Sequence, residues 1–176
     1  FMPFYPGAGV GGHCIPVDPA YLAWQVRRDA GRQFRILEEA QDVNQQMPAY
    51  VATRISDALN DAGRAVKGAH ILVLGVAYKP DVGDVRESPA LRVMQMLEKR
   101  GAKVSFHDPY IDAVSYNGSS LTRSELNSRM LASADCVALI TPHRAYDLEW
   151  IASHAPLVFD ARNAYGQKTP ENVVRL

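Results

Sequence analysis

Residues 70-HILVLGV-76 form a short, almost unbroken apolar run, in which Gly75 follows four large apolar residues. A run of this length is typical of a strand buried on both faces of a parallel sheet. Segments with helical periodicity alternate with further apolar runs after it, which favours right-handed crossovers and helices on both faces. The sequence therefore predicts an α/β fold, a Rossmann-like doubly wound parallel sheet, over residues 68–176.

The predicted elements of this domain follow one another at short intervals. Ser88 as cap, Pro89 at the first position and Gly101 as stop predict a helix between them. Further strands are expected near residues 104, 137 and 158. Further helices are expected over 122–133 and 146–154.

The first 67 residues are predicted to be organised differently. Residues 1–17 are rich in glycine and proline and predict a loop, and Asp18-Pro19 predicts a helix start with Asp18 as N-cap. That helix should run towards Gly31.

A second, much longer helix is expected over residues 36–62. Its apolar residues recur every fourth position and predict a continuous stripe of Val43, Met47, Val51, Ile55 and Leu59. Pro48 predicts a kink or a break. A helix of this length is expected to connect two domains or to form the seam of a homodimer.

The composition excludes several classes of protein. The chain has 176 residues, and its 19 basic residues balance 19 acidic ones, so nothing points to nucleic acid. No apolar run is long enough to cross a membrane. Cys14 and Cys136 are too few for a disulfide framework and favour a reducing, cytoplasmic location. Because the chain opens in the middle of a motif, we expect it to be the C-terminal part of a longer protein.

The stretch 7-GAGVGGHC-14 contains the spacing G-x-G-x-x-G of a dinucleotide-binding turn. Such a turn needs a strand before the first glycine and a helix at the last one. Pro3 and Pro6 argue against the strand, and Pro16 argues against the helix. The stretch is therefore not predicted to be a Rossmann turn.

The alternative is a flexible loop that delivers Cys14 to the front of a helix. A helix N-terminus stabilises an anion and favours the thiolate, and Asp18 could act as a base near the sulfur. A small structural thiol explains the same residues. Cys136 begins an apolar strand and is expected to lie in the core.

Charged residues follow the first predicted strand, where open α/β sheets hold their ligands. This cluster comprises Lys79, Asp81, Asp84, Arg86 and Glu87. Arg162, in 160-DARN-163, follows a later strand and should lie at the same edge as Lys79. Two such cations suit one anionic ligand.

Three further polar residues, Asp108, His107 and His143, lie near the ends of predicted strands. Asp108 follows the second strand, where a carboxylate can bind a ribose hydroxyl, although turn formation before Pro109 is the preferred interpretation. His107 and His143 lack partners at metal-ligand spacing and are expected in loops or solvent. No metal site is predicted.

Four motifs, in this order, closely resemble the UDP-glucose/GDP-mannose dehydrogenase family: PGAGVGGHCIPVDPAYL, GVAYKPDVGDVRESPA, HDPY and FDARN. The match extends over nearly the whole chain. The stretch GGHCIPVDP, with Val17 where UDP-glucose enzymes typically carry lysine, resembles the branch that oxidises UDP-N-acetylhexosamines such as UDP-N-acetylglucosamine.

The resemblance implies a two-step, NAD-dependent oxidation of the sugar C6 alcohol to a carboxylate, in bacteria often for surface polysaccharide. Cys14 matches the nucleophile that forms a thiohemiacetal and then a thioester, and Asp18 matches the carboxylate that assists water. Arg86 matches a residue that reaches NAD. Substrate contacts are implied for Tyr5, Pro6, Gly7, Ala8, Gly9, Val10, Gly11, Tyr78, Lys79 and Arg162.

The resemblance also implies a division of the chain. Residues 1–67 would carry the catalytic loop and a dimer-forming helical connector, and residues 68–176 would bind the UDP-sugar. The family's N-terminal NAD-binding domain is absent, so the chain alone is expected to be inactive. Two alternatives stay open: a non-catalytic nucleotide-binding or dimerisation module with a structural Cys14, and a self-sufficient NAD-binding domain over 68–176.

Overall fold

The computed structural model describes residues 5–167 and 169–176. Its helices are α1 (Asp18–Ala30), α2 (Arg35–Asp61), α3 (Pro89–Lys99), α4 (Ser128–Ser133) and α5 (Leu148–His154). Its strands are β1 (His70–Leu74), β2 (Lys103–His107), β3 (Ala113–Tyr116), β4 (Ser119–Thr122), β5 (Cys136–Leu139), β6 (Val158–Asp160) and β7 (Val173–Arg175). Among the described residues, no helix is long and apolar enough to cross a membrane.

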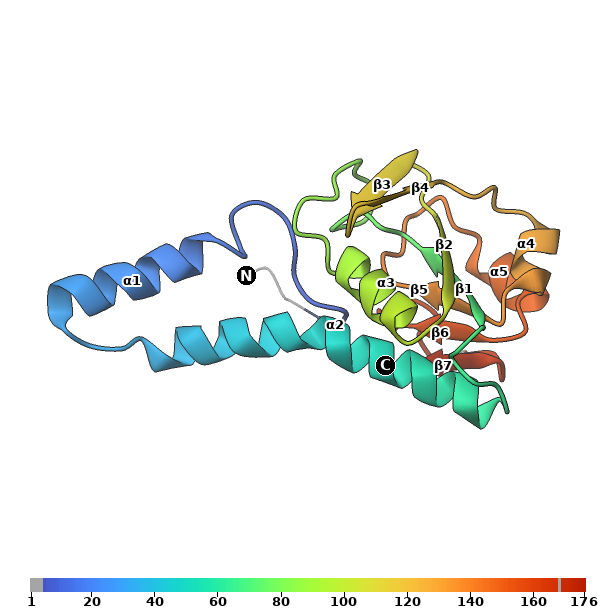
Figure 1. Cartoon of the computed structure of the whole chain (residues 1–176), viewed down its shortest axis with the longest axis horizontal. Coiled ribbons are helices and arrows are strands. Elements are labelled where there is room, and N and C mark those ends of the chain that lie inside the picture. The colour runs from blue at the N-terminus through green and yellow to red at the C-terminus, as the bar shows by residue number, and fades with distance from the viewer. Residues whose placement is uncertain (1–4, 168) are drawn as a thin grey trace.

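Five strands form one parallel sheet in the order β2-β1-β5-β6-β7. The side chains of β1 alternate between two cores. Ile71 and Val73 belong to the core that includes buried residues of α2 and α3. Leu72 and Leu74 belong to a second core with buried residues of α4 and α5. Helices therefore cover both faces (Figure 1), and the predicted doubly wound α/β fold is confirmed.

The helix between the first two strands begins and ends as predicted. Ser88 caps α3, with its hydroxyl accepting a hydrogen bond from the Ala90 N–H at 3.3 Å. Gly101 has a φ of +89°, which a residue with a side chain rarely adopts. These two residues therefore set the bounds of α3.

The helix predicted over 122–133 is wrong in its first half. Thr122 ends β4, which pairs with β3 in an antiparallel hairpin, and residues 123–127 are neither helix nor strand. Helix α4 begins only at Ser128, where the Asn127 side chain accepts from Met130 N–H. The hairpin turns at Asn117-Gly118, with φ values of +50° and +74°, the signature of a tight hairpin turn. The three-residue β7 was not predicted either.

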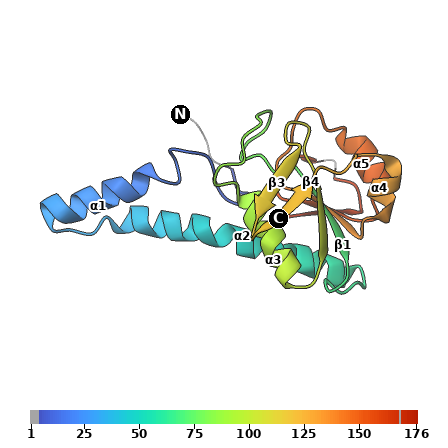
Figure 2. The same cartoon turned by 45° about the horizontal axis from the view of Figure 1, so that its top comes forward.

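Helix α1 and the N-terminal half of α2 project from the α/β unit as an arm, in both orientations (Figures 1 and 2). Asp18 is not the N-cap of α1, because it is the first helical residue and Val17 precedes it without a side-chain cap. Gly31 ends α1 in the left-handed conformation, as predicted.

Helix α2 has 27 residues and is therefore about 40 Å long at 1.5 Å per residue. The predicted apolar stripe is only half buried: Val51, Ile55 and Leu59 are completely buried, whereas Val43 is 52% exposed. The helix continues through Pro48 without a break. The C-terminal half of α2 is therefore part of the core, and its N-terminal half belongs to the arm.

A buried pair of polar side chains holds the loop that follows β1. Asp108 is fully buried, and its Oδ2 accepts hydrogen bonds from Val76 N–H at 2.8 Å and Ala77 N–H at 3.0 Å. Its Oδ1 accepts from Tyr110 N–H at 2.9 Å, which confirms the expected turn. Because the carboxylate has no exposed surface, it cannot bind a ribose, and that alternative is wrong.

His143 is the partner of this carboxylate. It lies in the loop between β5 and α5, as one of the two expected placements has it, but its expected exposure to solvent is wrong. Its ring is buried, with Nε2 at 3.0 Å from Asp108 Oδ2. Its Nδ1 accepts a hydrogen bond from Asp81 N–H at 2.9 Å. A nitrogen that accepts carries no proton, so the ring is the Nε2–H tautomer and donates to Asp108.

The Asp108 carboxylate is expected to make stability depend on pH. Burial raises its pKa, but hydrogen bonds from His143, Tyr110 and Ala77 outweigh burial, and the net pKa is lowered. A carboxyl whose pKa is lower in the folded protein than in the unfolded chain stabilises the fold at every pH above its unfolded-chain pKa of about 4. This contribution is lost as the pH falls through the pKa of the folded protein.

We therefore expect Asp108→Asn to lower the free energy of unfolding at neutral pH by roughly 1–3 kcal/mol, because three N–H donors lose a charged acceptor. The difference from wild type should shrink in acid. Urea unfolding at a series of acidic pH values measures this difference. Asp112→Asn is the control, because the Asp112 side chain is 88% exposed. An Asp108→Asn loss that stayed constant down to strong acid would contradict the assignment.

Candidate functional site

The glycine loop, residues 5–17, passes between helix α2, the loop after β1 and the turn after β6. Part of it is deeply buried, and Ala8 is only 2% exposed. Ala8 and Gly9 line a narrow gap together with Tyr78 and Lys79 from the loop after β1 and Thr141 from the segment after β5. The gap lies where the strand order reverses between β1 and β5, the usual ligand position in such sheets.

The glycines of this loop allow close packing of the protein against itself. A β-carbon on Gly11 would collide with the carbonyl group of Glu87. One on Gly12, whose φ is +99°, would lie 2.9 Å from the Tyr78 ring. Gly12 N–H also donates to the Arg86 carbonyl at 3.0 Å. The glycines therefore let other segments of the protein pack directly against the backbone of the loop.

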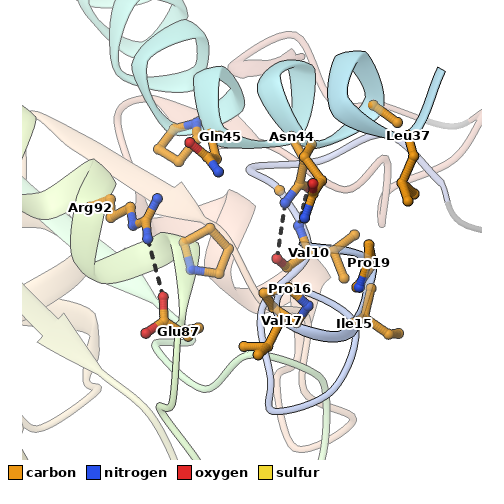
Figure 3. A pocket seen from close by; sticks show the side chains of 15 residues that line it. Val10, Ile15, Pro16, Val17, Pro19, Leu37, Asn44, Gln45, Glu87 and Arg92 are labelled. Atoms are coloured by element: carbon orange, nitrogen blue, oxygen red, sulfur yellow. Dashed lines mark hydrogen bonds and ion pairs between the residues drawn. The ribbon is translucent and has the colours of Figure 1, made fainter. Parts of the chain in front are cut away.

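Asn44 fixes the other side of the loop (Figure 3). Its Oδ1 accepts a hydrogen bond from Val10 N–H at 2.7 Å, and its Nδ2 donates to the Val10 carbonyl at 3.2 Å. Pro48, four residues on, has no N–H to donate to the Asn44 carbonyl. That carbonyl lies 3.2 Å from the place a Gly9 β-carbon would occupy.

Cys14 stands at the exposed end of this loop. Its Sγ lies 3.6 Å from His13 Nδ1. Its carbonyl accepts hydrogen bonds from Val17 N–H at 3.0 Å and Asp18 N–H at 2.8 Å, so a turn leads directly from Cys14 into α1. The structure thus brings Cys14 and Asp18 together at the entrance of this helix. Cys136, by contrast, is completely buried in β5, and burial raises its pKa to about 12.

Arg86 is the charged neighbour of the thiol. Its guanidinium makes three hydrogen bonds to the Asp84 carboxylate, of 2.7, 2.9 and 3.1 Å. The pKa of Arg86 is raised, first by these bonds and to a smaller extent by the negative charge of a Cys14 thiolate.

Lys79 and Arg162 lie at the same edge of the sheet, as predicted, and both line the gap beside Ala8. The Lys79 ammonium is 5.4 Å from the centre of the Tyr78 ring. A β-carbon on Gly7 would collide with the Arg162 side chain, 2.5 Å from its Nη1. Gly7 thus makes room for Arg162.

Two larger cavities adjoin this edge. One, of about 820 Å³, lies at the ends of β6 and β7 and is lined by Tyr5, Arg162 and Arg175 among others. The other, of about 490 Å³, separates Ile15 and its neighbours from α2 (Figure 3). Both have the size of small-molecule sites.

The residues present do not fit a complete dinucleotide site. A pyrophosphate turn needs several glycines between a strand and a helix. Only Gly75 follows β1 closely, at a φ of +80° and packed against Thr141, and α3 starts fourteen residues later. Nor do the parts of the chain that the structure describes contain a group of three or more potential metal-binding side chains.

Two residues of this site were not identified from the sequence. Asn44 lies within a helical pattern, where nothing marks a polar residue as a contact to a remote loop. Arg175 belongs to β7, which was itself not predicted. Only the tertiary arrangement places these two side chains beside the loop and the 820 Å³ cavity.

Comparisons with known proteins agree with this arrangement. Residues 72–167 match the UDP binding domain of the UDP-glucose/GDP-mannose dehydrogenase family, and residues 1–46 match the central domain of that family. UDP-N-acetyl-D-mannosamine dehydrogenase of Methanococcus maripaludis is 33% identical over 166 residues, 90% of this chain and 36% of that protein. NDP-N-acetyl-D-galactosaminuronic acid dehydrogenase of Ralstonia nicotianae is 32% identical over 93% of this chain and 37% of that protein.

Solved structures of nucleotide-sugar dehydrogenases also resemble this chain. A UDP-D-ManNAc dehydrogenase from Pyrococcus horikoshii superposes with a TM-score of 0.79 at 28% identity, over 98% of this chain and 39% of the other. This chain therefore spans little more than a third of the length of the relatives it matches. Because one family model covers more than half of it, the chain belongs to the UDP-glucose/GDP-mannose dehydrogenase family.

Proposed function

We propose that this chain is the catalytic-loop and UDP-binding part of an NAD-dependent nucleotide-sugar dehydrogenase. In this proposal residues 1–67 carry the loop and the connector, and residues 68–176 hold the UDP-sugar. The reaction oxidises the C6 alcohol of the sugar to a carboxylate. The observation that carries the proposal is the exposed Cys14 at the end of a loop packed into the ligand-binding edge of the sheet.

The steps proposed for this chain take place at the sulfur. The Cys14 thiolate adds to the C6 aldehyde and forms a carbon–sulfur bond, while the carbonyl oxygen takes a proton. After oxidation to the thioester, water adds to the same carbon and the thiolate leaves, which yields the carboxylate. Asp18, exposed at the start of α1, orients this water.

The oxidations need a hydride acceptor, for which we propose NAD. The described residues form no dinucleotide turn, so the proposal assigns the main NAD site to a domain outside this chain. Only Arg86, exposed beside Cys14, is offered as an NAD contact. The isolated chain should therefore not produce NADH. NADH formation by the isolated chain would contradict the assignment of the main NAD site to another domain.

The substrate is proposed to be a UDP-N-acetylhexosamine. UDP-N-acetylglucosamine was the example suggested by the loop sequence, whereas the relatives are named for N-acetylmannosamine and N-acetylgalactosaminuronic acid. UDP-N-acetyl-D-mannosamine is therefore the substrate to test first, beside the gluco and galacto epimers and UDP-glucose.

Thiol labelling provides a direct test of Cys14. We expect iodoacetamide to alkylate Cys14 near neutral pH and to leave Cys136 unmodified, because Cys136 is completely buried and its pKa is about 12. Mass spectrometry of the digested protein measures both sites. A UDP-sugar should slow the labelling of Cys14. Labelling unaffected by any UDP-sugar would instead favour a structural thiol in a non-catalytic module.

Turnover tests the mechanism in the complete gene product. Cys14→Ser should lower the rate of NADH production by roughly a thousandfold or more, because serine is a much weaker nucleophile near neutral pH. Cys136→Ser serves as the matched control and is expected to stay active if it folds. Full turnover by the Cys14→Ser enzyme would show that the nucleophile is another group.

We also propose that α2 forms a homodimer seam. Its N-terminal half leaves Ile36 77% exposed and Val43 52% exposed, and apolar side chains at such spacing are typical of a contact surface. Sedimentation should give twice the chain mass for wild type and the monomer mass for Ile36→Glu/Val43→Glu. Gln46→Glu, a charge added at an exposed polar position, should leave the mass unchanged. A monomeric wild type would contradict the seam.

A further inference from the structure

The cavity of about 820 Å³ at the ends of β6 and β7 contains two arginines, of which only Arg162 has been assigned a role. Arg175 comes from β7 and points its guanidinium at the turn after β6. Its Nη1 donates to Asn163 Oδ1 at 3.2 Å and to the Gly166 carbonyl at 3.3 Å. Both bonds use the same nitrogen, and Nε and Nη2 donate to none of the described residues.

Arg162 reaches the same cavity from the other strand. Asp160, buried at the end of β6, accepts hydrogen bonds from Arg162 N–H at 2.9 Å and Tyr165 N–H at 3.0 Å. These bonds fix the backbone of the turn, and Gly7 leaves room for the side chain. Within the described ranges, 5–167 and 169–176, no carboxylate side chain pairs with either guanidinium.

The lining of the cavity is therefore strongly positive. No Asp or Glu side chain belongs to it, and the exposed Tyr5 ring provides an aromatic wall. Guanidinium groups bind phosphate oxygens through two parallel hydrogen bonds, and each group can hold one phosphate. Two arginines in one cavity beside an aromatic ring suit a nucleoside diphosphate better than a single anion.

We infer that Arg175 is a second phosphate-binding residue of the nucleotide-sugar site, which holds the diphosphate together with Arg162. The inference rests on the proposed function, since the nucleotide sugar supplies the diphosphate. Arg175 is a binding residue and takes no part in the chemistry at Cys14. The hydrogen bonds to Asn163 and Gly166 orient its guanidinium before the ligand arrives.

Binding of UDP and of uridine to the 176-residue chain, measured by titration calorimetry, tests the inference. Arg175→Gln should weaken UDP binding about tenfold, the loss expected for one charge-assisted interaction, and should leave uridine binding unchanged. Arg162→Gln should act similarly. Arg32→Gln removes an exposed arginine between α1 and α2 and should behave as wild type.

Two variants separate ligand binding from a role in the turn. Asn163→Gly keeps the positive φ of +54° accessible and removes the Oδ1 acceptor of Arg175. It should bind UDP nearly as well as wild type. Arg175→Lys keeps the positive charge but loses the paired N–H donors of the guanidinium, and it should lose less affinity for UDP than Arg175→Gln.

The possible failures are distinguishable. If wild type binds UDP and Arg162→Gln weakens binding while Arg175→Gln does not, the inference is wrong and the proposed function stands. Equal losses in Arg175→Gln and Asn163→Gly, or an equal loss of uridine binding, would show that Arg175 only supports the turn and would overturn the inference. A wild-type chain that does not bind UDP would overturn both.

Discussion

The whole site depends on the close approach of the glycine loop to three other segments of the chain. At Gly11 a β-carbon would collide with the Glu87 carbonyl, and at Gly7 it would collide with the Arg162 side chain. A side chain at Gly11 would push the loop away from the Glu87 backbone, and a side chain at Gly7 would displace Arg162. Because Cys14 follows within a few residues, the position of its thiol depends on how closely the backbone at Gly11 and the backbone at Glu87 can pack.

Helix α2 supplies the complementary half of this arrangement. An interior proline usually disrupts a helix because one hydrogen bond is lost, yet α2 continues through Pro48. The carbonyl that lacks its helical donor belongs to Asn44, whose side chain makes both hydrogen bonds to Val10. The backbone carbonyl without a helical donor and the side chain that binds the loop therefore belong to the same residue, at the point where the loop crosses α2.

The sequence predicted the sheet better than it predicted the polar interior. Buried strands such as β1 and capped helices such as α3 are encoded locally, by apolar runs and by Ser88 and Pro89, and both were predicted correctly. The hairpin was not predicted although Asn117-Gly118 is a strong turn signal, because its two strands have only four residues each and carry no long apolar run. The burial of His143 was not predicted for a different reason: its partner Asp108 is 35 residues away, and only the tertiary fold brings them together.

The arginines around the site differ in whether a carboxylate already pairs with them. Arg86 is held by the Asp84 carboxylate in three hydrogen bonds, so a phosphate that bound it would have to compete with an existing anion. No described carboxylate side chain pairs with Arg162, and the only hydrogen bonds of the Arg175 guanidinium to described residues run to uncharged oxygens. Anion binding costs least where no carboxylate must be displaced. The two arginines at the ends of β6 and β7 therefore suit the proposed diphosphate site better than Arg86, which keeps its proposed role as an NAD contact.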